Sequence, residues 1–224
     1  VDALNAVDPM ITLATVPRWQ RLGAGEMVAT VKVIAYGVAR HSVEAAAAAG
    51  RGALRMHPAR LARAALIQTV TADDDGESGH RAIQSRLQAL QVTMQPKRLV
   101  PHREADLAAA LAQVGTADLI LILTASATSD PNDVAPEALR RAGGRVERFG
   151  MPVDPGNLLF LGALRGVPVI GLPGCARSPA LNGADQQMRY VVSDWLKAGD
   201  AVQRTVAQLS QQLRRFLDDQ AWLE

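Results

Sequence analysis

The feature that most limits how this chain can fold is an alternation of strand and helix patterns from Leu61 onward. Apolar strand patterns at residues 64–70, 118–124 and 167–172 are separated by segments whose apolar residues recur at helical spacing. The five inner residues of 118–124 are all apolar, as expected of a central parallel strand covered by helices on both faces. This order predicts an α/β fold: a three-layer α/β/α domain with a mostly parallel sheet.

The sequence divides into three regions. Residues 1–60 carry two β-branched runs and predict a small β-rich N-terminal element, the fragment of an upstream domain. Residues 64–185 hold the α/β pattern, and residues 186–224 predict a helical tail. Apolar residues in that tail recur at three- and four-residue spacing, which predicts a contact with the chain's own core or with another subunit. Because the chain opens with Val1 rather than Met, we expect it to be a piece of a longer polypeptide.

Composition limits which partners the chain is expected to bind and in which compartment it is expected to lie. Lys and Arg total 24 against 22 Asp and Glu, and aromatics make up only 4% of the chain. With no basic run and few rings for base stacking, nucleic acid is not an expected partner. The longest apolar run is too short to span a bilayer, so no membrane partner is expected either. A single cysteine, Cys175, excludes an intrachain disulfide and favours the cytoplasm. The four histidines lack metal-ligand spacing, so they predict no metal site.

Three loops of one character follow predicted strands. They span residues 124–139, 150–160 and 171–183 and are rich in Gly, Pro, Ser, Thr or Asp. The carboxyl ends of parallel strands meet at one edge of an α/β sheet, where open sheets bind ligands. We therefore expect these loops to form a single pocket built largely from backbone amides.

The loop after the central strand predicts an anion site at a helix start. Its hydroxyl and small side chains allow close approach of a ligand: Thr124, Ala125, Ser126, Ala127 and Thr128. Asp130 precedes Pro131, which predicts a helix N-cap with proline at the first helical position, and amides of that turn attract phosphate. Asp133 is the candidate catalytic residue and could share Mg²⁺ with Asp130. The alternative is that both carboxylates only stabilise the helix start.

The loop at 171–183 repeats that arrangement. Its candidate contacts are Pro173, Gly174, Cys175, Arg177 and Ser178. Ser178 lies before a proline and predicts a second N-cap. Arg177 would pair with a phosphate, unless it is a solvated surface arginine. Cys175 has no neighbouring base in the sequence, so nucleophilic catalysis by its thiol is not expected.

Two further loops complete the predicted edge. In the loop at 150–160, Pro155-Gly156 predicts a type II turn, and Pro155, Gly156 and Asn157 are candidate ligand contacts. The acidic loop at 73–79 also follows a predicted strand. It is either a site for Mg²⁺ or ligand, or a solvated loop that caps the next helix.

In this order and spacing, the loops resemble the molybdopterin-binding domain of molybdenum-cofactor biosynthesis. That domain occurs in molybdopterin adenylyltransferases, in molybdopterin molybdotransferases and in the competence-damage-inducible family. DPNDVAPEAL (130–139) resembles the family's PRDVTPEA helix start. VDPGN (153–157) and GVPVIGLPGCARSPAL (166–181) are similar to the molybdotransferase's PGKP turn and GLPGNPVSA loop. The resemblance covers about residues 64–185.

The resemblance implies a ligand and a set of roles. Residues 124–128 and 173–178 would cradle molybdopterin and its phosphate, and Asp133 matches the aspartate implicated in Mg²⁺-assisted chemistry. The family implies a homo-oligomer, a dimer or trimer, and fused or partner domains of cofactor assembly. Adenylyl or molybdate transfer would be the reaction.

The sequence also departs from the family pattern. The family's TGGTG loop is TASAT here, without the glycines that allow the closest backbone approach. Asn132 and Asn157 replace two cations that would pair with phosphate. These differences favour a non-catalytic binding or carrier module. A transferase and a nucleotide pyrophosphate hydrolase on the same scaffold remain the alternatives.

Overall fold

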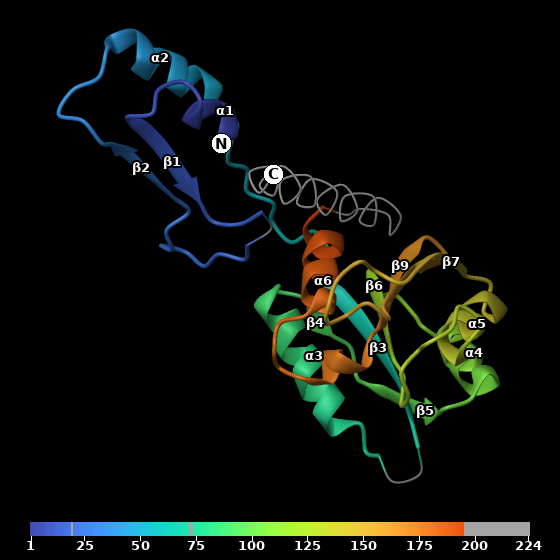
Figure 1. Ribbon diagram of the computed structural model, residues 1–224. Coiled ribbons are helices and arrows are strands. Elements are labelled where there is room, and N and C mark those ends of the chain that lie inside the picture. The colour runs from blue at the N-terminus through green and yellow to red at the C-terminus, as the bar shows by residue number, and fades with distance from the viewer. Residues whose placement is uncertain (19, 72–73, 195–224) are drawn as a thin grey trace. The chain divides into compact units, whose positions relative to one another are not determined.

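The computed structural model describes residues 1–18, 20–71 and 74–194, which fall into two compact units that divide after His57 (Figure 1). The elements of the first unit are α1 (Asp2–Asn5), β1 (Ile11–Thr15), β2 (Ala29–Val33) and α2 (Arg40–Ala49). The two strands pair antiparallel. Asn5 ties α1 to β1, because its side-chain amide donates to the carbonyl of Leu13 at 3.0 Å and its oxygen accepts the N–H of Leu13 at 2.8 Å.

The first unit has an apolar core of its own. Leu4, Ile11, Leu13 and Ala46 are buried together. The predicted strands are present, and two helices accompany them, so the unit is built from equal numbers of strands and helices.

The second unit begins at Pro58 and contains a seven-stranded sheet. Its elements are β3 (Arg63–Val70), α3 (Glu77–Ala89), β4 (Thr93–Met94), β5 (Arg98–Pro101), α4 (Glu104–Ala112), β6 (Leu119–Leu123), α5 (Val134–Arg141), β7 (Arg145–Phe149), β8 (Phe160–Leu164), β9 (Val167–Leu172), the 3₁₀-helix η1 (Gly174–Arg177) and α6 (Gly183–Asp194). The strand order is β4-β3-β6-β9-β8-β7, with β5 also paired to β3. Strands β3, β4, β5, β6 and β9 run parallel, whereas β8 runs antiparallel to its neighbours β7 and β9.

Helices cover both faces of this sheet (Figure 1). On one face, α4 and α5 pack on Ile120 and Ile122 of β6. On the other face, Leu123 lies against Gly79 at the start of α3. Because every residue of β6 is buried, its continuous apolar run is explained by contacts on both sides. The predicted three-layer α/β fold with a mostly parallel sheet is confirmed.

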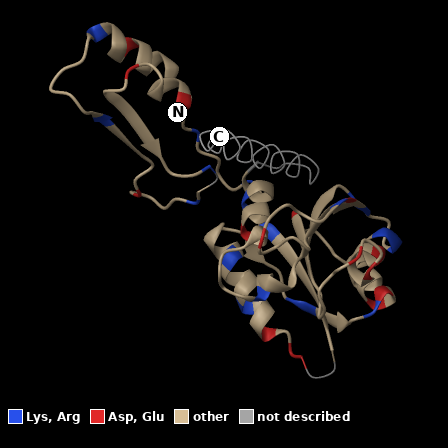
Figure 2. Ribbon diagram, in the orientation of Figure 1, with Lys and Arg blue, Asp and Glu red and all other residues tan. Residues whose placement is uncertain are grey.

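Strands β6, β8 and β9 contain no charged residue, whereas β3 begins with Arg63 and both β5 and β7 carry charges (Figure 2). In the described part of the chain, no helix is both long and apolar enough to cross a bilayer.

Several predicted boundaries differ from the structure. Between α3 and α4 the structure has two short strands that the sequence analysis does not name, β4 and β5, and both pair with β3. The predicted loop at 150–160 runs into β8, a strand that the sequence pattern missed because FLGAL is short and directly follows the loop. At the start of the predicted tail, Met188, Val191 and Val192 of α6 are buried. The rest of the predicted helical tail, residues 195–224, lies outside the described residues.

The sheet brings the three predicted loops to one edge. The loops after β6 and β9 leave the carboxyl ends of parallel strands. Strand β8 runs antiparallel to β9 with Phe160 paired to Gly171, so the β7–β8 loop joins the same edge. The ends of β3 and β5 also lie there, because these strands are parallel to β6. We call this edge, formed by residues 102, 124–133, 154–157 and 173–183, the carboxyl rim.

Candidate anion-binding rim

The predicted contacts differ widely in exposure. Thr124, Thr128, Gly156 and Pro173 are buried, Ala125, Gly174, Cys175 and Arg177 are half-buried, and Ser126, Ala127, Asp130, Pro155, Asn157 and Ser178 are exposed. The rim therefore brings the predicted residues to one edge, but only some of their side chains are accessible to a ligand.

The loop after β6 is held in shape by its own threonines. The Thr124 hydroxyl donates to the carbonyl of Ser126 at 2.7 Å, and its oxygen lies 3.2 Å from the Thr128 hydroxyl. Both side chains are only 4% exposed. Both hydroxyls therefore make hydrogen bonds within the loop and have little exposed surface.

The groups that this loop can offer to a ligand are backbone amides. Ala125 donates its N–H to the Thr69 hydroxyl at 2.8 Å. Within the described residues, no group accepts the N–H of Ser126, Ala127 or Thr128. Three consecutive amide donors at the end of a central strand form a partial positive charge suited to an anionic oxygen.

Arg177 supplies a formal charge beside these amides. Its guanidinium donates to the carbonyl of Thr124, so it bridges the ends of β6 and β9. The stem of Arg177 lies over Gly79, where an added Cβ would come within 3.5 Å of the arginine Cγ and 2.6 Å of Leu123 Cδ2. A glycine at this position of α3 thus gives the arginine stem and the leucine room to pack. This hydrogen bond orients the guanidinium and leaves its other N–H groups available as donors.

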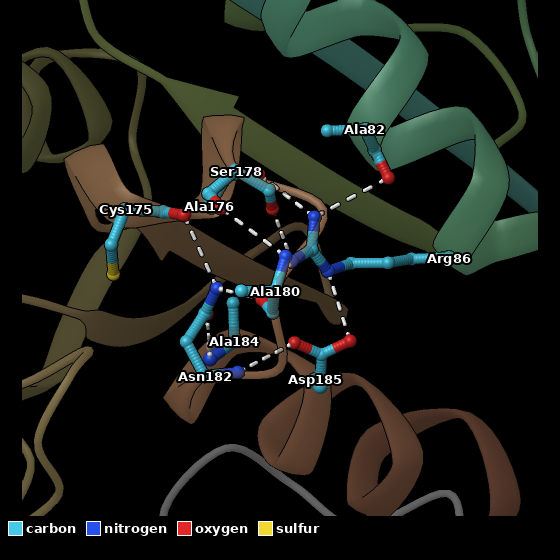
Figure 3. A network of polar contacts seen from close by, with 9 residues as sticks. All are labelled: Ala82, Arg86, Cys175, Ala176, Ser178, Ala180, Asn182, Ala184 and Asp185. Carbon is cyan, nitrogen blue, oxygen red and sulfur yellow. Dashed lines mark hydrogen bonds and ion pairs between the residues drawn. The ribbon is translucent and has the colours of Figure 1, made fainter.

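A second arginine, from α3, holds the loop after β9 in place (Figure 3). Arg86 of α3 is only 8% exposed, and it donates from Nε to Asp185 at 2.9 Å. Its terminal nitrogens donate to four carbonyls: Ala82 at 3.3 Å, Ala176 at 2.8 Å, Ser178 at 2.7 Å and Ala180 at 3.0 Å. All five guanidinium donors therefore have acceptors, three of them in the rim loop.

The same loop ends in a capping box at Asn182, so the predicted N-cap at Ser178 is wrong. The side chain of Ser178 accepts the N–H of Ala180, but no helix begins there. Helix α6 begins at Gly183, where Asn182 accepts the N–H of Ala184 at 3.0 Å and Asp185 accepts the N–H of Asn182 at 2.9 Å. The N-cap is therefore Asn182, and the turn before Ser178 belongs to η1.

The β7–β8 loop closes against this helix start. Pro155 accepts the N–H of Gly183 through its carbonyl at 2.8 Å. Gly156 has a φ of +120°, and a Cβ there would lie 2.7 Å from the Gly183 nitrogen. Asn157 is exposed beside them, and its carbonyl accepts the N–H of Met151 at 2.8 Å. The third predicted loop therefore meets the second through backbone contacts.

The two aspartates of the first loop have local roles. Asp130 was predicted to cap the helix, but α5 begins at Val134 and Asp133 is its N-cap. Asp133 accepts the N–H of Val134 at 2.7 Å and that of Ser129 at 3.3 Å, one with each carboxylate oxygen. Asp130 instead accepts the N–H of Asn132 at 2.7 Å, closing a turn one step earlier. The prediction failed because either aspartate could cap, and the backbone turn at 130–133 decides between them.

Acidic residues before α3 also stabilise local backbone. Asp74 accepts the N–H of Gly76 and Asp75 that of Glu77, each at 2.8 Å. Glu77 pairs with Lys97, and that hydrogen bond lowers the pKa of the Glu77 carboxyl. Among the residues that the structure describes, no three His, Cys, Asp or Glu side chains are grouped to hold a metal ion.

His102 is the rim residue that sequence reasoning missed. It follows β5, and its ring lies between Thr69 of β3 and Ser126 of the β6 loop, 2.8 Å from the first hydroxyl and 2.9 Å from the second. It also lines an open hollow of about 610 Å³ at the ends of β3 and β5. The available signal was its place shortly after the apolar pair Leu99-Val100, which can form a strand.

Cys175 lies in η1 and is half-buried. Burial raises the pKa of this thiol above its ordinary value of 9.0. The thiolate is the nucleophilic form, so a raised pKa agrees with the expectation that Cys175 is not a nucleophile.

Comparison with known proteins gives short or partial matches. A family described as a protein of unknown function, DUF3375, matches residues 175–224. An uncharacterised protein of Mycolicibacterium smegmatis is 61% identical over 41 residues, which are 18% of this chain and 9% of that protein. The crystal structure of the molybdopterin biosynthesis MoeA protein from Pyrococcus horikosii matches with a TM-score of 0.42 and 19% identity. That match covers 65% of this chain and 37% of the solved one.

Proposed function

We propose that the carboxyl rim binds the phosphate of an anionic ligand, and that the ligand is molybdopterin in molybdenum-cofactor biosynthesis. The observation that carries the anion site is the row of amides at Ser126, Ala127 and Thr128 beside the guanidinium of Arg177. Backbone N–H groups and an arginine together are the donors that phosphate sites use. The choice of molybdopterin rests on the resemblance of residues 130–139, 153–157 and 166–181 to the family motifs.

Binding without turnover fits the chemistry of the rim better than catalysis. The threonine hydroxyls are used within the loop, and both oxygens of Asp133 already accept backbone N–H groups. The Cys175 thiol is held in its protonated form by burial. Each side chain that the resemblance offers for chemistry thus has a structural role, which supports a cofactor-binding or carrier module.

Calorimetric titration with molybdopterin and with inorganic pyrophosphate tests this proposal. Arg177→Ala should weaken binding about 10- to 100-fold, because a hydrogen bond to a charged group contributes roughly 1.5–3 kcal/mol. Asp133→Ala should leave the affinity of folded protein nearly unchanged. Arg81→Ala is the matched control, since Arg81 is an exposed arginine of α3. Equal affinity of Arg177→Ala and wild type would overturn the site.

Turnover distinguishes the binding module from its alternatives. Wild-type protein should neither adenylylate nor metallate molybdopterin, with or without Mg²⁺. Hydrolysis of the P–O–P bond of a nucleotide pyrophosphate to two phosphate monoesters, in the absence of pterin, would instead identify a hydrolase on this scaffold. Either reaction would contradict a purely binding role.

A further inference from the structure

The strongest unassigned feature of the rim is a chain of three polar side chains. Thr69, His102 and Ser126 come from three different segments, β3, the end of β5 and the loop after β6. The Thr69 oxygen lies 2.8 Å from His102 Nδ1, and His102 Nε2 lies 2.9 Å from the Ser126 oxygen. Thr69 is 1% exposed and Ser126 is exposed, so the chain runs from the interior to the ligand side.

The direction of these hydrogen bonds follows from counting protons. The Thr69 oxygen already accepts the N–H of Ala125 at 2.8 Å. Its one proton needs an acceptor, and among the described residues His102 Nδ1 is the acceptor within reach. The opposite arrangement, with Nδ1–H donating to Thr69, would leave a buried hydroxyl proton without a partner. Such a loss disfavours that tautomer by roughly tenfold or more.

A neutral imidazole carries its proton on one nitrogen, and the partner of the other nitrogen selects which. With Nδ1 accepting from Thr69, the proton resides on Nε2 and is donated to Ser126. The Ser126 oxygen is then an acceptor towards His102, and its own hydroxyl proton is left for the solvent side.

We propose that Thr69 fixes His102 as the Nε2–H tautomer and thereby makes Ser126 a hydrogen-bond donor to an oxygen of the bound anion. The ligand part of this inference rests on the proposed phosphate site, because Ser126 also contributes one of the three free amides. Ser126 and His102 thus favour a ligand that presents an acceptor-only oxygen, as a phosphate monoester does. The pair does not act as a serine nucleophile with a histidine base, since Nε2 holds a proton and cannot take one from Ser126.

The tautomer can be measured directly. In protein labelled with ¹⁵N-histidine, under alkaline conditions where histidine is neutral, long-range ¹H–¹⁵N correlation separates the two tautomers. His102→Gln assigns the signal by its loss. We expect wild type and Thr69→Ser to show the Nε2–H form alone, and Thr69→Val to show an added fraction of the Nδ1–H form. A wild-type ring protonated at Nδ1 would overturn the inference even if Thr69→Val did not fold.

Phosphate titration tests the donor role of Ser126. With inorganic phosphate as the probe, Ser126→Ala should weaken affinity about tenfold, and Thr69→Val should cause a similar loss with no further loss in the double variant. Ser129→Ala is the control, an exposed serine of the same loop. Unchanged affinity of Ser126→Ala would overturn the donor role while Arg177→Ala still reports on the site. If wild type does not bind phosphate, the proposed function and the donor role both fail. The measured tautomer of His102 then still tests whether Thr69 fixes the imidazole.

Discussion

Replacing Arg86 by Met tests whether one buried guanidinium holds the loop after β9. The Arg86 and Asp185 side chains are 7% and 11% exposed, so the substitution leaves a buried carboxylate whose remaining partner among the described residues is the N–H of Asn182. Removing one member of a buried ion pair costs about 3–5 kcal/mol. Ser178 and Ala180 are exposed and their carbonyls can bind water instead, so we expect no further loss of stability from them.

The expected result is a loss of about 3–5 kcal/mol in the free energy of unfolding of the second unit, and a weaker phosphate affinity because the loop is released. Urea denaturation followed by circular dichroism measures this, with an unchanged slope m as the check that the transition is comparable. Arg86→Lys keeps the charge but not the five-donor fork, so we expect an intermediate loss. Arg81→Met, an exposed change on the same helix, should stay within about 0.5 kcal/mol of wild type.

A double variant tests whether the loss of stability comes from the unpaired Asp185 carboxylate. Adding Asp185→Asn to Arg86→Met removes the uncompensated charge, so the double variant should be more stable than Arg86→Met alone. A loss below about 1 kcal/mol for Arg86→Met, or a double variant that is less stable still, would refute the reasoning.

Three other substitutions or reagents report on separate parts of the molecule. Gly156→Ala places a Cβ 2.7 Å from the Gly183 nitrogen at a φ of +120°, so we expect a loss of about 1–3 kcal/mol and weaker pyrophosphate binding, measured by denaturation and calorimetry. The hydrogen bond from Arg63 lowers the pKa of Asp118 below its ordinary 3.8, so this carboxylate stabilises the fold above that value and loses the effect as pH falls through the lowered pKa. Asp118→Asn should therefore be less stable than wild type at neutral pH and approach it in acid, and a pH-independent difference would contradict this. Burial raises the pKa of Cys175, so iodoacetamide should alkylate it more slowly than free cysteine at pH 8, and a faster reaction would show that the thiol is activated.

Local patterns in the sequence were sufficient for the layers of the second unit. The all-apolar run at 119–123 required cover on both faces, and the parallel order it implied placed the loops after residues 123 and 172 at one edge. These are consequences of periodicity and chain direction, which neighbouring residues encode. The missed strand at 160–164 shows the limit, because its place depends on antiparallel pairing with β9 and not on its own five residues.

Which donor meets which acceptor was decided by the tertiary structure alone. Asp130 and Asp133 both had the sequence of a cap, and the turn between them gave the role to Asp133. His102 and Ser126 are 24 residues apart, and they meet because β5 and β6 both pair with β3. Spacing along a chain determines which face a residue occupies, but a hydrogen bond needs two atoms within about 3 Å, and only strand order in space supplies that.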